Sequence, residues 1–195
     1  METIKLVYSS VGLFFTSMRR EGGLGRPLGF AVIGGSVGGL VAVFFNLGMQ
    51  ALLLMAGAQN GPGVAPGLGA GFYAILFVIV VVLMPIGIVL QTFIISGVFH
   101  VCLMILGGAN QTFETTFRVV SYSSGSTSLL LLIPFCGQYI QGIVNLVFAA
   151  IGLMHAHETS GVKATFAVLL PILFCCGGAI LFYALIIGAV VMNAR

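Results

Sequence analysis

Charged side chains are scarce in this sequence, and those beyond the N-terminal region, apart from Arg195, lie in two short stretches. Together with nearby side chains that can carry a proton, they define a candidate polar cluster: His100, Glu114, Arg118, Tyr122, His155, His157, Glu158 and Lys163. Ionisable groups at membrane depth are costly and mark functional regions. We predict that Arg118 pairs with Glu158 or with Glu114, its neighbour at i,i+4 spacing, and that at least one histidine joins the network.

The histidines and glutamates of this cluster are also possible metal ligands. However, His155 and His157 are two positions apart, so on a helix they point about 200° away from each other and cannot both bind one ion. The remaining metal candidates are His100, His157 and Glu158. We expect a hydrogen-bonded network at the helix ends instead, with no metal and no cofactor.

A second polar pattern lies within an apolar stretch. Gln138, Gln141 and Asn145 share one face of a predicted helix. Polar side chains in hydrocarbon must find partners, so this stripe faces protein or a cavity. The serines and threonines between residues 121 and 128 offer partners for interhelical hydrogen bonds. The alternative is a polar pathway for a solute.

Small residues form a third pattern. Gly34, Gly35, Gly38 and Gly39 make two overlapping GxxxG pairs, which let helix backbones approach closely. The pairs predict either packing inside one subunit or a dimer face. Ser123 and Ser124 precede Gly125 as in an intramembrane serine protease, but Tyr122 stands where that motif needs glycine, so we expect no enzymatic activity.

Composition indicates the environment in which these residues act. The 195 residues are 59% hydrophobic and 6% charged, with a mean hydropathy of +1.21. A soluble domain needs roughly a quarter of its residues charged, so lipid must surround much of this chain. The net charge of +3 is too small and too dispersed for binding nucleic acid. Membrane lipids are therefore the first expected partner.

The apolar runs predict an all-α, polytopic integral membrane protein. A helix needs about 20 apolar residues to cross the bilayer core. Five such spans are expected, at residues 28–56, 68–106, 113–133, 138–155 and 162–192, so that residues 28–195 form the membrane domain.

The second span is long enough to raise an alternative. As one helix it would measure about 55 Å, well beyond the bilayer core. It is either a hairpin that turns at residues 84–87 or one helix kinked at Pro85. The kinked helix is favoured, because a turn there has no polar side chain to satisfy the freed backbone groups.

Basic residues predict the orientation. With five spans, six of the seven basic residues fall on one side, with Arg195 as the exception: Lys5, Arg19, Arg20, Arg26, Arg118 and Lys163. Short loops rich in basic residues stay in the cytoplasm, so the N-terminus is expected there. A hairpin at Pro85 would move Arg118 to the opposite side and split the basic set.

Residues 1–27 are predicted to be a cytoplasmic or interfacial amphipathic segment. Its apolar residues recur at helical spacing: Ile4, Val7, Val11, Phe14, Phe15 and Met18. This pattern is typical of a helix that lies among the lipid headgroups. A short helix packed on the membrane domain is the alternative.

Three stretches of the chain resemble the Yip1 domain family. They are GGANQTFETTFRVVSYSS, IPFCGQYI and IGLMHAHETSGVKATFAVLLP, and FFTSMRREGGLGRPLGFAV is similar to the family's entry segment. The chain departs from the family where Ser9-Ser10 replaces a common proline. Eukaryotic relatives act in traffic between endoplasmic reticulum and Golgi, where they bind Rab GTPases and other Yip1-type proteins.

The resemblance implies a five-helix domain with a cytoplasmic N-terminus and no enzymatic residues. The short form is similar to the prokaryotic branch, which implies a bacterial inner membrane. The expected function is a non-enzymatic membrane-organising or interaction module, with itself or other membrane proteins as possible partners. The competing class is a small transporter, channel or lipid-moving protein that uses the polar third and fourth spans.

Overall fold

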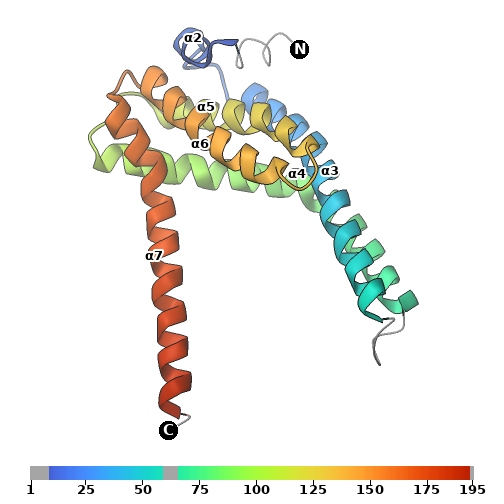
Figure 1. The fold of residues 1–195 in the computed structure, drawn as a ribbon. Coiled ribbons are helices and arrows are strands. Elements are labelled where there is room, and N and C mark those ends of the chain that lie inside the picture. The colour runs from blue at the N-terminus through green and yellow to red at the C-terminus, as the bar shows by residue number, and fades with distance from the viewer. Residues whose placement is uncertain (1–8, 59–65, 194–195) are drawn as a thin grey trace.

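The structure is a computed structural model that describes residues 9–58 and 66–193. The described residues form helices without any strand, in agreement with the all-α prediction (Figure 1). The elements are α2 (Val11–Ser17), α3 (Gly25–Ala58), α4 (Pro66–Ile105), α5 (Phe113–Thr127), the 3-10 helix η1 (Ser128–Leu132), α6 (Gly137–Ala156) and α7 (Gly161–Asn193).

Four of these helices are long and apolar enough to cross a membrane. They are α3, α4, α6 and α7, and they correspond to the first, second, fourth and fifth predicted spans. The chain is therefore a multi-pass membrane protein. The third predicted span, 113–133, is not one continuous helix, because α5 ends at Thr127 and the chain continues as the 3-10 helix η1.

Helix α5 differs from the other long helices because protein, not lipid, surrounds it. It packs against α3, α4 and α6. Much of its surface is polar and buried, including Thr115, Thr116, Ser121, Ser123, Ser126 and Thr127. A helix enclosed in this way needs no apolar face toward lipid, so its low hydropathy is compatible with a position inside the bundle.

Helix α4 is one helix with Pro85 in its interior, so the prediction of a kinked helix is confirmed and no hairpin forms. Proline removes a backbone donor and bends a helix. Figure 1 shows that α4 changes direction along its length: its first part pairs with α3, and its later part runs beneath α5 and α6.

The glycines of α3 explain why this helix packs so closely on its neighbours. A Cβ atom on Gly34 would come closer than 3.0 Å to the carbonyl oxygen of Gly125, and one on Gly38 would do the same at Ser128. On the adjacent face, Gly35 meets Ile88 and Gly39 meets Met84. All four contacts lie inside the chain, so the GxxxG pairs serve packing within the subunit.

Helix α2 is shorter than the predicted amphipathic segment. It ends at Ser17, and α3 begins at Gly25. It packs on α6, and Phe15 is buried against Gly152. The described part of its apolar stripe therefore contacts protein, as in the packed alternative, while Ile4 and Val7 lie outside the described residues.

The apolar core lies at one end of the bundle, where α4 and α6 end and α5 and α7 begin. We call this region, together with α2 and the segment that links it to α3, the polar end. Phe15, Leu103, Val119, Leu153 and Ala164 are almost fully buried there. This core fixes the helix ends that carry most of the predicted cluster.

Candidate functional site

Arg118 holds the N-terminal segment on the bundle. Its side chain is only 7% exposed, and its Nε and Nη2 atoms donate to Glu114 Oε1 at 3.1 and 2.9 Å. The same guanidinium donates from Nη1 to the carbonyl of Arg19 and from Nη2 to that of Gly23, at 3.0 and 2.9 Å. One buried cation thus joins α5 to the segment between α2 and α3.

Further contacts fasten this segment. Glu114 Oε1 also accepts a hydrogen bond from the backbone N–H of Gly23 at 2.8 Å. Gly23 has a φ of 88°, a conformation that favours glycine. Arg20 forms an ion pair with Glu158 in the loop between α6 and α7. The predicted partners of Arg118 are thus divided: Glu114 binds Arg118, and Glu158 binds Arg20.

A chain of hydrogen bonds joins two histidines through a threonine. His157 is fully buried, and its Nδ1 accepts a hydrogen bond from the backbone N–H of Gln111 at 3.2 Å. In the neutral ring the proton therefore lies on Nε2, which donates to Thr116 Oγ1 at 2.9 Å. The same hydroxyl lies 2.9 Å from His100 Nδ1, and its own proton is available for donation to that nitrogen.

Burial keeps His157 neutral. It lowers the pKa of this imidazole to about 4, and the nearby charges of His100 and Arg20 act in the same direction. The loop that carries His157 is fixed by Asn110, whose Nδ2 donates to the His157 carbonyl at 3.0 Å. Glu158 follows with a φ of 51°, which places the turn directly after α6. The neutral ring of His157 therefore connects the end of α6 to α5 by hydrogen bonds.

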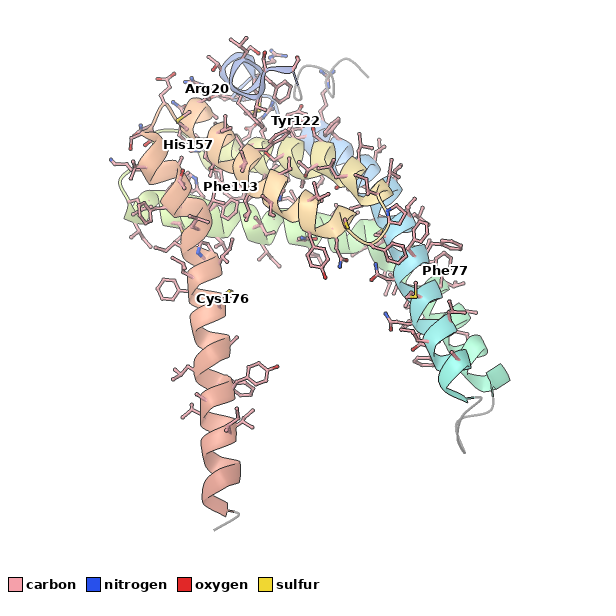
Figure 2. All side chains as sticks on the ribbon, viewed as in Figure 1. Arg20, Phe77, Phe113, Tyr122, His157 and Cys176 are labelled. Atoms are coloured by element: carbon pink, nitrogen blue, oxygen red, sulfur yellow. The ribbon has the colours of Figure 1, made fainter. Side chains whose placement is uncertain are left out.

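The other residues of the predicted cluster do not take part in the hydrogen bonds that join His157, Thr116 and His100. His155 packs over Gly12 of α2, where an added Cβ would meet its Nε2 at 2.8 Å. Lys163 Nζ donates to the carbonyl of Gly107 at 2.9 Å, directly after the end of α4. The Tyr122 ring lies 5.4 Å from both Phe14 and Phe30. Figure 2 shows Arg20, His157 and Tyr122 at different places of the polar end.

The metal candidates are not arranged around a common point. His100 and His157 share Thr116 between them, and their ring centroids are 6.0 Å apart. Glu158 is paired with Arg20. Within residues 9–58 and 66–193, no group of three His, Cys, Asp or Glu side chains is placed to hold a metal ion.

The polar end also contains an open pocket of about 470 Å³ between α2, α5 and the beginning of α3. We call it the basic pocket. Its lining residues are Phe14, Met18, Arg19, Glu21, Gly22, Arg26, Arg118 and Tyr122. The guanidinium of Arg118 is occupied by Glu114 and two carbonyls, whereas Arg19 and Arg26 are exposed. Two cations and one carboxylate, Glu21, are therefore accessible beside an apolar wall.

The polar stripe of α6 is only partly paired. Thr127 Oγ1 donates to Asn145 Oδ1 at a long 3.4 Å. Ser124 and Ser128 instead bond to carbonyls of their own helix. In the part of the chain that the structure describes, the side-chain amides of Gln138 and Gln141 make no hydrogen bond. The interhelical hydrogen bonds expected for this stripe are therefore reduced to one.

Instead, the stripe lines two cavities. Gln138 borders one of about 370 Å³, together with Asn46 and Gln50 of α3. Gln141 and Asn145 border another of about 280 Å³. The second cavity also contains Gln91 of α4, which we did not predict as a site residue although it is a rare amide in a long apolar run.

Comparison with known proteins gives one match. The family model of the Yip1 domain matches residues 5–192, which is nearly the whole chain. No curated protein matches. No solved structure matches either.

Proposed function

Because this chain belongs to the Yip1 domain family, we propose that it is a non-enzymatic protein that organises the membrane or binds partners there through its polar end. One observation carries this proposal. Most polar groups of the polar end are used in structural contacts, while Arg19 and Arg26 stay accessible in the basic pocket. Such a surface is suited to recognition and not to bond-making chemistry.

The proposed topology has five crossings in a bacterial inner membrane, with the polar end in the cytoplasm. The third crossing along the chain is formed by α5 and η1 together. Their 15 and five residues would measure about 32 Å at roughly 1.5 and 2.0 Å per residue, close to the bilayer core of about 30 Å. Arg118 and Lys163 at the polar end support the cytoplasmic assignment.

The partner proposed for the basic pocket is the headgroup of an anionic phospholipid. The guanidiniums of Arg19 and Arg26 can bind phosphate, and a cytoplasmic leaflet with anionic lipids attracts such groups by about 1 kcal/mol for each cation. Phe14 and Met18 line the same pocket and suit the apolar part of a lipid. Because Arg118 holds the linking segment in place, the pocket is formed before any lipid arrives.

The test is lipid retention in nanodiscs of mixed phosphatidylglycerol and phosphatidylcholine. The wild-type protein should retain phosphatidylglycerol through detergent exchange, measured by native mass spectrometry. The Arg19→Gln/Arg26→Gln variant should lose most of it. Lys163→Gln is the matched control, because Lys163 is a cation of the polar end outside the basic pocket. Equal retention of both lipids by the wild type would refute the proposed partner.

A second function, movement of a solute or lipid along the polar stripe, is favoured by the cavities at Gln138, Gln141 and Asn145. Its test is transbilayer movement of fluorescent lipid, and release of small solutes, in proteoliposomes. Rates equal to those of empty vesicles would exclude it.

A further inference from the structure

The 280 Å³ cavity lies among α3, α4, α5, η1 and α6, of which α3, α4 and α6 are apolar enough to span a membrane. We call it the carboxamide groove. Helix α5 packs on α3, α4 and α6, and all four helices contribute residues to the lining of the groove together with η1. Its polar side chains are Gln91, Thr92, Ser124, Ser128, Gln141 and Asn145.

The three carboxamides of the groove lack sufficient partners. Asn145 accepts one long hydrogen bond at Oδ1, and none is donated by its Nδ2. Gln91 and Gln141 make none within the described residues. Gln91 is exposed inside the most apolar helix of the protein. An amide without a hydrogen bond in hydrocarbon is strongly unfavourable, so the groove is built to receive polar atoms from another molecule.

The hydroxyls of the groove point to the kind of group that fits. Thr92 donates to the carbonyl of Ile88 at 2.7 Å, and Ser128 donates to that of Ser124 at 2.6 Å. Their protons are used, but their oxygens can still accept. The carboxamides supply both NH₂ donors and carbonyl acceptors. The groove therefore matches a ligand that has a hydroxyl group as donor and carbonyl groups as acceptors.

The charge and the apolar lining of the groove limit the class of ligand that it can bind. None of the described residues that line the groove carries a charge. An unpaired phosphate or ammonium group there would lose its hydration without compensation. Ile88, Ile95, Phe99, Val120 and Leu131 supply apolar walls. An uncharged headgroup on acyl chains satisfies both conditions.

We propose that the carboxamide groove binds the headgroup of an uncharged glycerolipid with a free hydroxyl and ester carbonyls, of which diacylglycerol is the simplest. The carboxamides of Gln91, Gln141 and Asn145 hold the hydroxyl and the ester groups, and the acyl chains lie along the apolar walls. This binding requires neither lipid movement nor the anionic headgroup of the basic pocket, so it stands apart from both functions proposed above.

The test uses the full chain in nanodiscs and a diacylglycerol with a photoreactive diazirine on one acyl chain. Wild-type protein should be labelled on α4 or α6, and unlabelled diacylglycerol should compete. Triacylglycerol, which lacks the hydroxyl, and phosphatidic acid, which is charged, should compete at least tenfold more weakly, as expected for the loss of one or two hydrogen bonds.

The Gln91→Leu/Gln141→Leu variant should lose competable labelling by about tenfold or more. Gln138→Leu is the control, because this amide of the same stripe borders the other cavity. If the double variant does not fold, the same labelling is measured with the single variant Gln141→Leu. Labelling that is unchanged in these variants, or equal competition by triacylglycerol, would overturn the proposal, as would cross-linking that shows a second copy of the chain in the groove.

Discussion

The close packing of α3 on η1 can be tested directly by a substitution at Gly38. A Cβ atom at Gly38 would lie closer than 3.0 Å to the carbonyl oxygen of Ser128 and 3.3 Å from the Leu131 Cβ. The obstructing oxygen belongs to a backbone and cannot rotate away as a side-chain end can. Gly38→Ala should therefore force the two helices apart.

The magnitude follows from two opposing terms. Overpacking a rigid contact costs about 1–3 kcal/mol, and a backbone clash belongs at the upper end. Alanine in place of glycine inside a helix raises the free energy of unfolding by about 1 kcal/mol. The net loss expected for Gly38→Ala is about 2 kcal/mol. Gly48 lies in the same helix, and an added Cβ there meets no atom within 4 Å. Gly48→Ala should therefore raise the free energy of unfolding by about 1 kcal/mol.

The assay is thermal unfolding of both variants in the same detergent. The difference of about 3 kcal/mol corresponds to roughly 6–12 °C between their midpoints for a chain of this size. Gly35→Ala should fall between them, because the atoms it meets belong to the movable side chain of Ile88. Midpoints that coincide for Gly38→Ala and Gly48→Ala would show that α3 does not approach η1 as described.

Three further predictions concern the polar end. Arg118→Ala strands Glu114 and frees two carbonyls, so it should lower the free energy of unfolding by about 3–5 kcal/mol, against little change for Arg19→Ala, as measured by denaturation in detergent. The pKa of His157 is about 4 in the fold and 6.5 ordinarily. The unfolded chain thus takes up the proton first, and stability should fall by up to about 3 kcal/mol as the pH drops from 6.5 to 4. His157→Gln should flatten that part of the unfolding profile. For the proposed orientation, an impermeant maleimide should label Cys136 in the turn before α6 from outside and a cysteine at Ser160 only from the cytoplasm. External labelling of a cysteine at Asn110 would contradict it.

The apolar helices were predictable because lipid imposes a simple condition on a chain. A helix exposed to hydrocarbon must be apolar over about 20 residues, so four spans are visible as hydropathy alone, including the long α4 with Pro85. The third span could be predicted less well for the same reason. Helix α5 is surrounded by other helices, and hydropathy does not indicate where a mostly polar helix ends or that its last turn becomes η1.

The candidate site was predictable where the partners are close in sequence. The pairing of Arg118 with Glu114 follows from their i,i+4 spacing. The ion pair between Arg20 and Glu158 joins residues 138 positions apart, and no periodicity relates them. Thr116 is likewise one of many hydroxyls in this region, and only the fold places it between two imidazoles.

Arg118 is one of the few charged residues of this protein, and it takes part both in helix packing and in the lining of the basic pocket. In a soluble protein a lost ion pair can be replaced by water, but here the guanidinium is buried, and its donors are used by Glu114 and by carbonyls of the segment that links α2 to α3. The same guanidinium borders the basic pocket. The position of Arg19 beside that pocket therefore depends on a bond from its own carbonyl to Arg118. The backbone at Arg19 is thus held on α5 by the same guanidinium that borders the pocket, while the exposed Arg19 side chain can turn toward a ligand without breaking this bond.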